Sequence, residues 1–320
     1  MKPPVPYVTG WQFTVQKHLP PPPTKVTPDC CINDDTGEME SREIDRVERC
    51  LLHPPLQGSY DSSRVDLHIY DTLRVGDNHN AQLVVVDVLA ADRPLESLEG
   101  KRVVAKIYDP LYFDDDEGYI NPFASVDKHY THEAELYKAF SDLQGSMIPG
   151  YYGAFSLDIF VNSSTKRCVR LILIEFVPGL PMRDCQPRTL PRQCRQSIMK
   201  SVVDFETLSY TRDILLTDIH PRNIILVNTG EQKHTVFIDF GDALFGRAGR
   251  YTNHSDSGQF SGIYISPLLR WHKVHRRTFD FDSWIDWDWQ HWLEAEYQHT
   301  AESITQEMRD KFLPKFLLGL

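Results

Sequence analysis

The stretch from residue 216 to residue 243, LTDIHPRNIILVNTGEQKHTVFIDFGDA, decides the fold prediction because polar residues at fixed spacing alternate with two apolar runs. Asp218 and Asn223 are five residues apart in one predicted loop, and Asp239 follows sixteen residues later at the end of HTVFID. The two apolar runs predict a hairpin that would bring the three side chains to one end. Hard oxygen ligands of this type suit magnesium. The alternative is that all three are ordinary turn residues that cap strands.

The composition limits the classes of protein that the chain can belong to. Its 320 residues are 41% hydrophobic and 11% aromatic, which is ample for a buried core. The formal net charge of −11 argues against nucleic acid and anionic membranes as partners. Without a long apolar run or a signal peptide we expect an intracellular, cytoplasmic protein. Six cysteines without a repeated C-x-x-C spacing argue against a zinc site and a disulfide framework.

Residues 1–60 are rich in proline and include the consecutive run Pro20–Pro23. We interpret this segment as a flexible or surface-draped extension that is partly disordered. It could serve as a stiff spacer, or its proline-rich motif could bind a partner domain.

From about residue 65 the pattern predicts regular elements. Three β-branched runs, 65–75, 81–91 and 101–109, predict an antiparallel meander, and 151–161 and 168–177 add two strands. Apolar residues at helical spacing predict a helix from about Ser125 or Asp127 to Phe140. We expect further helices at 190–215 and beyond 279, where a Trp-rich tract is interpreted as packing, with a carbohydrate platform as the alternative. The prediction is an α+β bilobal arrangement: an antiparallel sheet with one helix at 61–177 and a shortened, mainly helical lobe at 178–320.

The order of the short motifs resembles the protein-kinase-like superfamily. Val103-Val104-Ala105-Lys106 resembles its V-A-I-K segment, the stretch from Asp218 to Asn223 its D-x-x-x-x-N catalytic loop, and Asp239-Phe240-Gly241 its D-F-G. The form D-x-H-P-x-N, with His220, is similar to aminoglycoside-phosphotransferase-like kinases. The chain also resembles uncharacterised fungal protein-kinase-like proteins.

This resemblance implies a protein-kinase-like fold that binds ATP and Mg²⁺ between its lobes. Lys106 would then hold the phosphates, Glu133 would hold Lys106, with Glu135 as the alternative, and Asn223 and Asp239 would hold the metal. Further residues would contact the nucleotide or the acceptor: Gly76 in the phosphate loop, Glu175 and Val177 in a hinge that bonds adenine through its backbone, Asp218 as the base, and His220 at the transferred phosphoryl group.

Two departures from the family pattern leave two functions open. The glycine-rich loop is matched by Gly76, but Asn78 and Ala81 replace later glycines and restrict positive φ. Leu216-Thr217 replaces the His-Arg before the catalytic Asp. We expect a phosphotransferase that moves the γ-phosphoryl group of ATP to an unidentified hydroxyl acceptor, a small molecule first and a protein second. The alternative is a pseudokinase that acts as a nucleotide-binding or scaffold module.

Overall fold

The computed structural model describes residues 2–229, 232–246 and 259–314. The chain divides into two compact units. Unit 1 comprises residues 1–176 and 240–242, and unit 2 comprises residues 177–239 and 243–320. The chain therefore leaves unit 2 after Asp239, contributes three residues to unit 1, and returns to unit 2 at Ala243.

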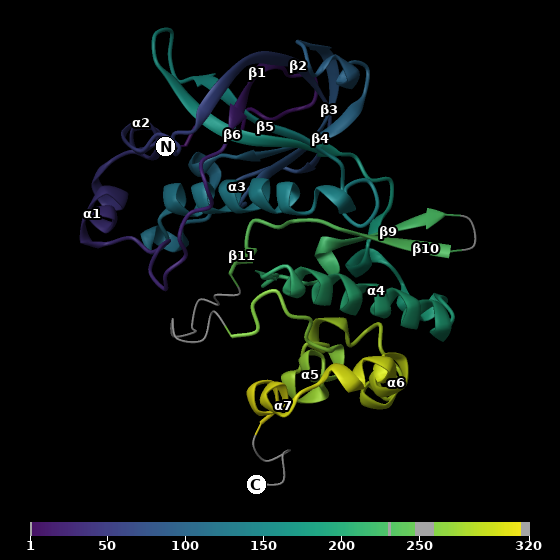
Figure 1. The fold of residues 1–320 in the computed structure, drawn as a ribbon. Helices are drawn as coiled ribbons and strands as arrows, with labels where there is room; N and C mark the ends of the chain where they lie inside the picture. The colour runs from purple at the N-terminus through teal and green to yellow at the C-terminus, as the bar shows by residue number, and fades with distance from the viewer. Residues whose placement is uncertain (1, 230–231, 247–258, 315–320) are drawn as a thin grey trace. The chain divides into compact units, whose positions relative to one another are not determined.

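Unit 1 is built on a closed antiparallel barrel whose strands follow the order β1-β2-β3-β4-β6-β5, with β5 pairing back to β1 (Figure 1). Alternate side chains point inward, as Val65, Leu67 and Ile69 of β2 do, because successive side chains of a strand face opposite sides. The predicted meander is confirmed in β2, β3 and β4, and the two additional strands are β5 and β6. The strands are β1 (Gln12–Leu19), β2 (Ser59–Arg74), β3 (Gln82–Ala91), β4 (Arg102–Tyr108), β5 (Tyr151–Phe160) and β6 (Lys166–Glu175).

The closed barrel contradicts the expected fold class. We expected an α+β bilobal, protein-kinase-like fold with an antiparallel five-stranded sheet, and the structure instead closes six strands into a barrel. The additional strand is β1, which pairs with residues 59–68 of β2 and residues 154–156 of β5. Its sequence, QFTVQKHL, has few apolar residues, so its period of two did not stand out within the proline-rich segment. The interpretation of residues 1–60 as an extension was therefore wrong for β1.

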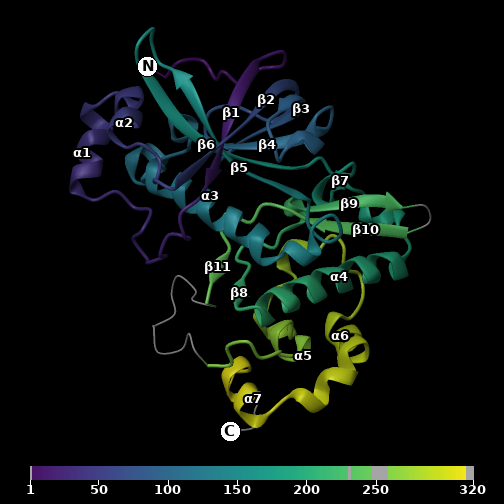
Figure 2. The same cartoon turned by 45° about the horizontal axis from the view of Figure 1, so that its top comes forward.

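Helices of unit 1 begin at polar capping residues. α1 (Asp35–Glu43) and α2 (Arg46–Leu52) lie in the same N-terminal segment as β1. The carboxylates of Asp34 and Asp45 each accept a hydrogen bond from a backbone N–H in the first turn of the helix that follows. α3 (Pro122–Ala139) packs against β4, β5 and β6 (Figure 2). It starts three residues before the expected Ser125 because Asn121 caps it and Pro122 fits its first turn.

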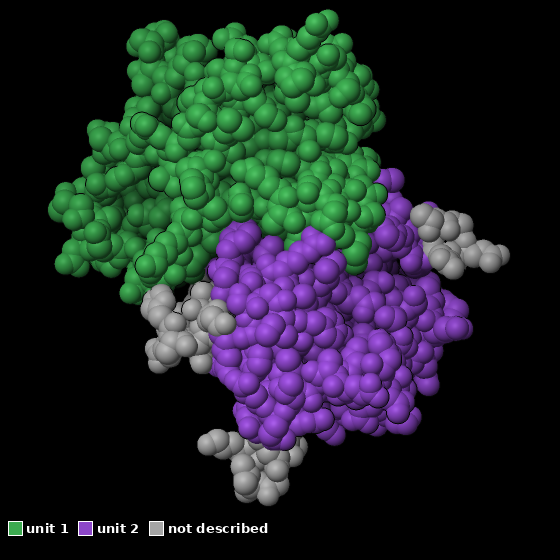
Figure 3. Space-filling view, viewed as in Figure 1, with its two compact units in different colours: residues 1–176, 240–242 green, residues 177–239, 243–320 purple. Residues whose placement is uncertain are grey.

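Unit 2, purple in Figure 3, contains a strand hairpin and several helices. The hairpin rests on the longest of these helices, where Phe237 stacks on Phe205 with ring centroids 4.0 Å apart. Trp271 and Trp284 are almost fully buried, which agrees with packing as the role of the Trp-rich tract. The strands are β7 (Leu180–Pro181), β8 (Ile214–Leu215), β9 (Ile224–Thr229), β10 (Gln232–Phe237) and β11 (Leu244–Phe245), and the helices are α4 (Arg192–Thr211), α5 (Pro267–Arg270), α6 (Trp289–Tyr297) and α7 (Gln306–Phe312).

Candidate active site

Lys106 and Glu133 form a buried ion pair in unit 1. Val103, Ala105 and Ile107 of β4 face the barrel interior, so the intervening Lys106 faces outward, toward α3. There its Nζ lies 2.5 Å from Oε2 of Glu133, and both residues are less than 5% exposed. The expected partner of Lys106 is thus Glu133, whereas Glu135 lies on the exposed side of the helix and contacts Lys138.

Tyr108, which our sequence analysis did not single out, also contacts this ion pair. Its hydroxyl donates a hydrogen bond of 2.8 Å to the same Oε2 atom of Glu133. Two donors on one oxygen fix the carboxylate, while the other oxygen, Oε1, is buried without a hydrogen-bond partner among the described residues. The signal that could have revealed Tyr108 is its spacing: it lies two residues after Lys106 and therefore on the same face of β4.

The segment 240–242 is attached to α3 by each of its three residues. The ring of Phe240 packs edge-on against Tyr137, with centroids 5.6 Å apart. Gly241 lies so close to the helix that a Cβ there would approach the Cβ of His129 to 3.0 Å. The carboxylate of Asp242 accepts a hydrogen bond of 2.6 Å from Nζ of the buried Lys128, and Nε2 of His129 lies 3.4 Å away.

Charge dominates the environment of Asp242. Burial alone would raise the pKa of this carboxyl, but the hydrogen bonds and positive charges of His129 and Lys128 outweigh it. They hold the pKa of Asp242 well below its ordinary value, so the group is ionised at neutral pH. Because Asp242 follows Asp239 by three residues, this attachment restricts the backbone immediately after Asp239.

In unit 2 the predicted hairpin is present, and its register aligns the polar residues. Phe237, the last residue of β10, pairs with Ile224, the first residue of β9. One step further the N–H of Ile238 donates to the carbonyl oxygen of Asn223 at 2.9 Å. Asn223, which precedes β9, and Asp239, which follows β10, therefore lie at the same end of the hairpin. Asp239 has φ of 65°, a left-handed conformation that is uncommon for residues other than glycine.

Asp218 and Asn223 belong to one hydrogen-bond network. Nδ2 of Asn223 donates to Oδ2 of Asp218 at 2.8 Å and to its backbone carbonyl at 3.1 Å. Nη2 of Arg222 donates to Oδ1 of Asp218 at 2.6 Å. Sequence reasoning missed Arg222, because a spacing of four residues predicts an ion pair on a helix but not in a loop.

His220 has a structural contact of its own. Its Nδ1 accepts a hydrogen bond of 3.1 Å from the N–H of Arg222, which caps the 3₁₀ turn Pro221–Asn223. Nδ1 is therefore not protonated in this arrangement, and a neutral ring carries its proton on Nε2, which lies 3.8 Å from Asp280. His220 thus shapes the turn that positions Asn223.

An amide oxygen and a carboxylate are residue types that a magnesium ion accepts when water or phosphate supplies its remaining ligands. Both hydrogen bonds of Asn223 to Asp218 use its Nδ2, so its amide oxygen takes no part in them. Asp239, which follows β10 at the same end of the hairpin, has a carboxylate. Among the described residues no group of three or more His, Cys, Asp or Glu could hold a metal ion. One or two protein oxygens suit magnesium, which binds in this way alongside substrate phosphates.

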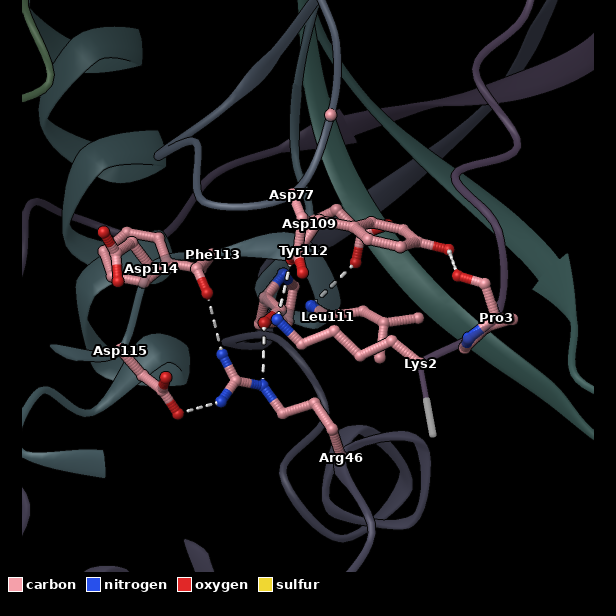
Figure 4. Close-up of polar contacts among 12 residues, drawn as sticks. Lys2, Pro3, Arg46, Asp77, Asp109, Leu111, Tyr112, Phe113, Asp114 and Asp115 are labelled. Carbon is pink, nitrogen blue, oxygen red and sulfur yellow. Dashed lines mark hydrogen bonds and ion pairs between the residues drawn. The ribbon is translucent and has the colours of Figure 1, made fainter. Parts of the chain in front are cut away.

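The loop around Gly76 differs from an open phosphate-binding loop. The N–H of Gly76 donates to Oε1 of Gln82 at 2.8 Å, and Nε2 of Gln82 donates back to the Gly76 carbonyl. Nζ of Lys2 bonds the neighbouring Asp77 at 2.7 Å (Figure 4). The N–H of Gly76 is thus occupied, which disagrees with its expected contact to phosphate. Asn78 adopts φ of 64°, so the expectation that it restricts positive φ was wrong.

Glu175 and Val177, which we expected in an adenine-binding hinge, lie on either side of the boundary between the units along the chain. Glu175 ends β6, and its Oε2 accepts a hydrogen bond of 2.9 Å from the N–H of Gly150. The side chain thereby holds the start of the adjacent strand β5. Val177 is half-buried and is the first residue of unit 2.

Comparison of the chain with protein-family models gave no match, and comparison with curated proteins gave none either. In the part of the chain that the structure describes, no helix is both long and apolar enough to cross a bilayer.

Proposed function

We propose that the protein is a phosphotransferase that uses ATP and magnesium and transfers the γ-phosphoryl group to a hydroxyl acceptor. The observation that supports this most strongly is the hairpin of unit 2. Asn223 precedes its first strand and donates a hydrogen bond to Asp218, and Asp239 follows its second strand. Phosphoryl transfer requires a base or orienting group, oxygen ligands for a metal, and a cation for the phosphates. Asp218, the pair Asn223 and Asp239, and Lys106 have these chemical properties.

Each of these residues has a defined part in the proposed reaction. Asp218 orients the acceptor hydroxyl and accepts its proton, since an ionised carboxylate keeps accepting capacity beyond the bonds from Asn223 and Arg222. Lys106 holds phosphate oxygens, and Glu133 and Tyr108 keep its ammonium group in place. Asn223 and Asp239 hold magnesium, which neutralises charge on the phosphates when bound.

A small hydroxyl compound is the favoured acceptor. The form Asp218-x-His220-Pro221-x-Asn223 resembles that of small-molecule kinases, which supports this ranking over a protein acceptor. The net charge of −11 disfavours polyanionic acceptors, because the protein's field repels them.

Two observations favour a second candidate, a nucleotide-binding module without turnover. The N–H of Gly76 is occupied by Gln82, so it does not offer the phosphates a donor. Arg222 occupies one oxygen of Asp218 and competes there with an acceptor hydroxyl. Turnover that depends on Asp218 would support the phosphotransferase, whereas ATP binding without turnover would support the nucleotide-binding module.

A thermal-shift titration tests nucleotide binding, which both candidates require. ATP with magnesium should stabilise the protein by about 2.7 kcal/mol at a hundredfold excess over the dissociation constant. The Asp239→Ala variant should lose the magnesium-dependent part of the shift, whereas Asp310→Ala, an exposed aspartate on α7, should retain it. Absence of any shift with ATP at millimolar concentration would exclude both candidates.

A further inference from the structure

Cys30 and Cys31 bring two free thiols into contact in unit 1, and neither cysteine has a part in the proposed phosphotransfer. Their Sγ atoms are 3.5 Å apart, well beyond a disulfide bond of about 2.05 Å. The two cysteines are the central residues of a turn that the N–H of Ile32 closes by donating to the carbonyl of Asp29 at 3.1 Å. Both side chains are half-buried.

The turn is anchored, so the thiols keep their spacing. The N–H of Asn121 donates to the carbonyl oxygen of Cys31 at 2.9 Å, immediately before α3 begins. Ile32 also forms a bridge with Ile120. The two sulfur atoms are therefore presented together on a fixed backbone, as a bidentate ligand requires.

Cys30 and Cys31 both line a cavity of about 460 Å³ in the same unit. Leu52, Leu56 and Phe123 give this cavity an apolar part, and Asp127 and Lys128 add charged groups. A ligand that bridges the sulfur atoms could thus place an organic group against apolar side chains, which is the common composition of a small-molecule site. A simple disulfide would leave this space unused.

We propose that Cys30 and Cys31 form a dithiol site for organic trivalent arsenicals, whose organic group occupies the adjoining cavity. Arsenic that carries one organic group needs only two sulfur ligands. Zinc usually needs four protein ligands, and no cluster of three His, Cys, Asp or Glu capable of holding a metal occurs among the described residues. Soft metal and metalloid centres prefer sulfur ligands.

Binding is a condensation in which sulfur and arsenic keep their oxidation states. With an arsenic oxide R–As=O, two S–As bonds form, the As=O bond breaks, and both thiol protons leave with the oxygen as one water molecule. Burial and the contact with Cys30 raise the pKa of the Cys31 thiol, so this residue enters the reaction in its protonated form. No additional oxidant or reductant is needed.

The site can be located with phenylarsine oxide on the reduced full-length protein. Equimolar reagent should give one phenylarsenic adduct per chain that survives washing with a monothiol and is removed by a dithiol. After mild trypsin digestion the adduct should be found on the peptide 26–42, which contains Cys30 and Cys31 and no other cysteine. This measurement needs no variant, and it is independent of the proposed phosphotransferase activity.

Variants then test the need for both thiols. Cys30→Ala and Cys31→Ala should each bind the arsenical at least about 100-fold more weakly, because the second contact is lost. Cys185→Ala, which removes another half-buried thiol, should bind like the parent. The absence of an adduct in the parent, an adduct on another peptide, or undiminished binding by a folded Cys30→Ala variant would overturn the proposal.

Discussion

Glu133 receives hydrogen bonds from two buried residues of one strand through a single oxygen atom, and the negative charge of its carboxylate strengthens both bonds. Replacement by glutamine preserves the shape of the side chain but removes that charge. Lys106 and Tyr108 would then donate to a neutral amide oxygen or turn toward other groups. The stability of unit 1 and the orientation of Lys106 therefore depend on the same residue.

We predict that Glu133→Gln lowers the free energy of unfolding by about 1.5–3 kcal/mol, the usual contribution of a hydrogen bond to a charged group. Glu135→Gln is the matched control, because Glu135 is partly exposed and contacts Lys138 on the surface. Its effect should stay within about 0.5 kcal/mol. Chemical denaturation of the two variants measures the difference, and equal stabilities would contradict a special role of Glu133.

His18 provides a pH-dependent prediction in the barrel. Its ring is fully buried, and its Nδ1 lies 2.6 Å from the Tyr130 hydroxyl. Burial, with a smaller contribution from the charge of Arg170, lowers the pKa of His18 from 6.5 to about 4. Between pH 6.5 and about pH 4, His18 binds a proton in the unfolded chain but not in the folded chain. The free energy of unfolding therefore falls as the pH decreases through this range.

Comparison of the parent with His18→Gln isolates this effect. Asp127 has a pKa raised to about 6, mainly by burial, and it acts in the opposite direction in both proteins. The stability advantage of the parent over His18→Gln should shrink by up to about 3 kcal/mol between pH 7 and pH 4. Urea denaturation at several pH values measures it, and a difference independent of pH would show that His18 is not held neutral.

At the scale of elements, α3 connects two groups of contacts in unit 1. Glu133 pairs with Lys106 of β4, and one turn earlier Lys128 and His129 hold Asp242. The same helix thereby positions Lys106, the proposed phosphate-binding residue, and the segment directly after Asp239. We expect that loosening either contact affects the proposed reaction without touching a reacting group.

We predict that Lys128→Met destabilises the protein by roughly 1–3 kcal/mol at pH 7 and lowers turnover. Lys138→Met on the same helix should change neither property, because Lys138 is exposed. The depressed pKa of Asp242 means that its stabilisation is complete above the ordinary pKa of aspartate and is lost as the pH falls through the folded value. The difference between parent and variant should therefore narrow below about pH 4. A constant difference down to pH 2 would contradict this.

The elements that the sequence predicted correctly have strong local patterns. The β-branched runs of β2, β3 and β4 and the helical spacing of α3 are visible within a short window. β1 has no such signal, because its place depends on pairing with residues 59–68 and 154–156, far along the chain. The closure of the barrel depends on this strand, which explains why the fold class was predicted wrongly although most of its strands were found.

At the scale of the whole molecule, the proposed site was predictable where spacing alone determines contact. The register of β9 and β10 follows from two apolar runs, and it places Asn223 and Ile238 side by side. The contacts of Gly76 with Gln82 and of Arg222 with Asp218 depend on side-chain geometry that no pattern specifies. These same contacts are the two observations that favour the second candidate, a nucleotide-binding module without turnover.

The most direct test of the central claim is transfer of the γ-phosphoryl group of ATP by the parent and by Asp218→Asn. The phosphatase-treated protein is incubated with ATP, magnesium and a panel of amino-alcohols, sugars and basic proteins, and phosphorylated product is quantified. We predict transfer to a small hydroxyl compound by the parent and at least a hundredfold less by Asp218→Asn, in line with the factor of about 10² to 10⁴ that a positioned base contributes. The thermal shift of the variant with ATP should remain. Equal transfer by both proteins, or none by a parent that binds ATP, would contradict the assignment of Asp218 as the base and of the protein as a phosphotransferase.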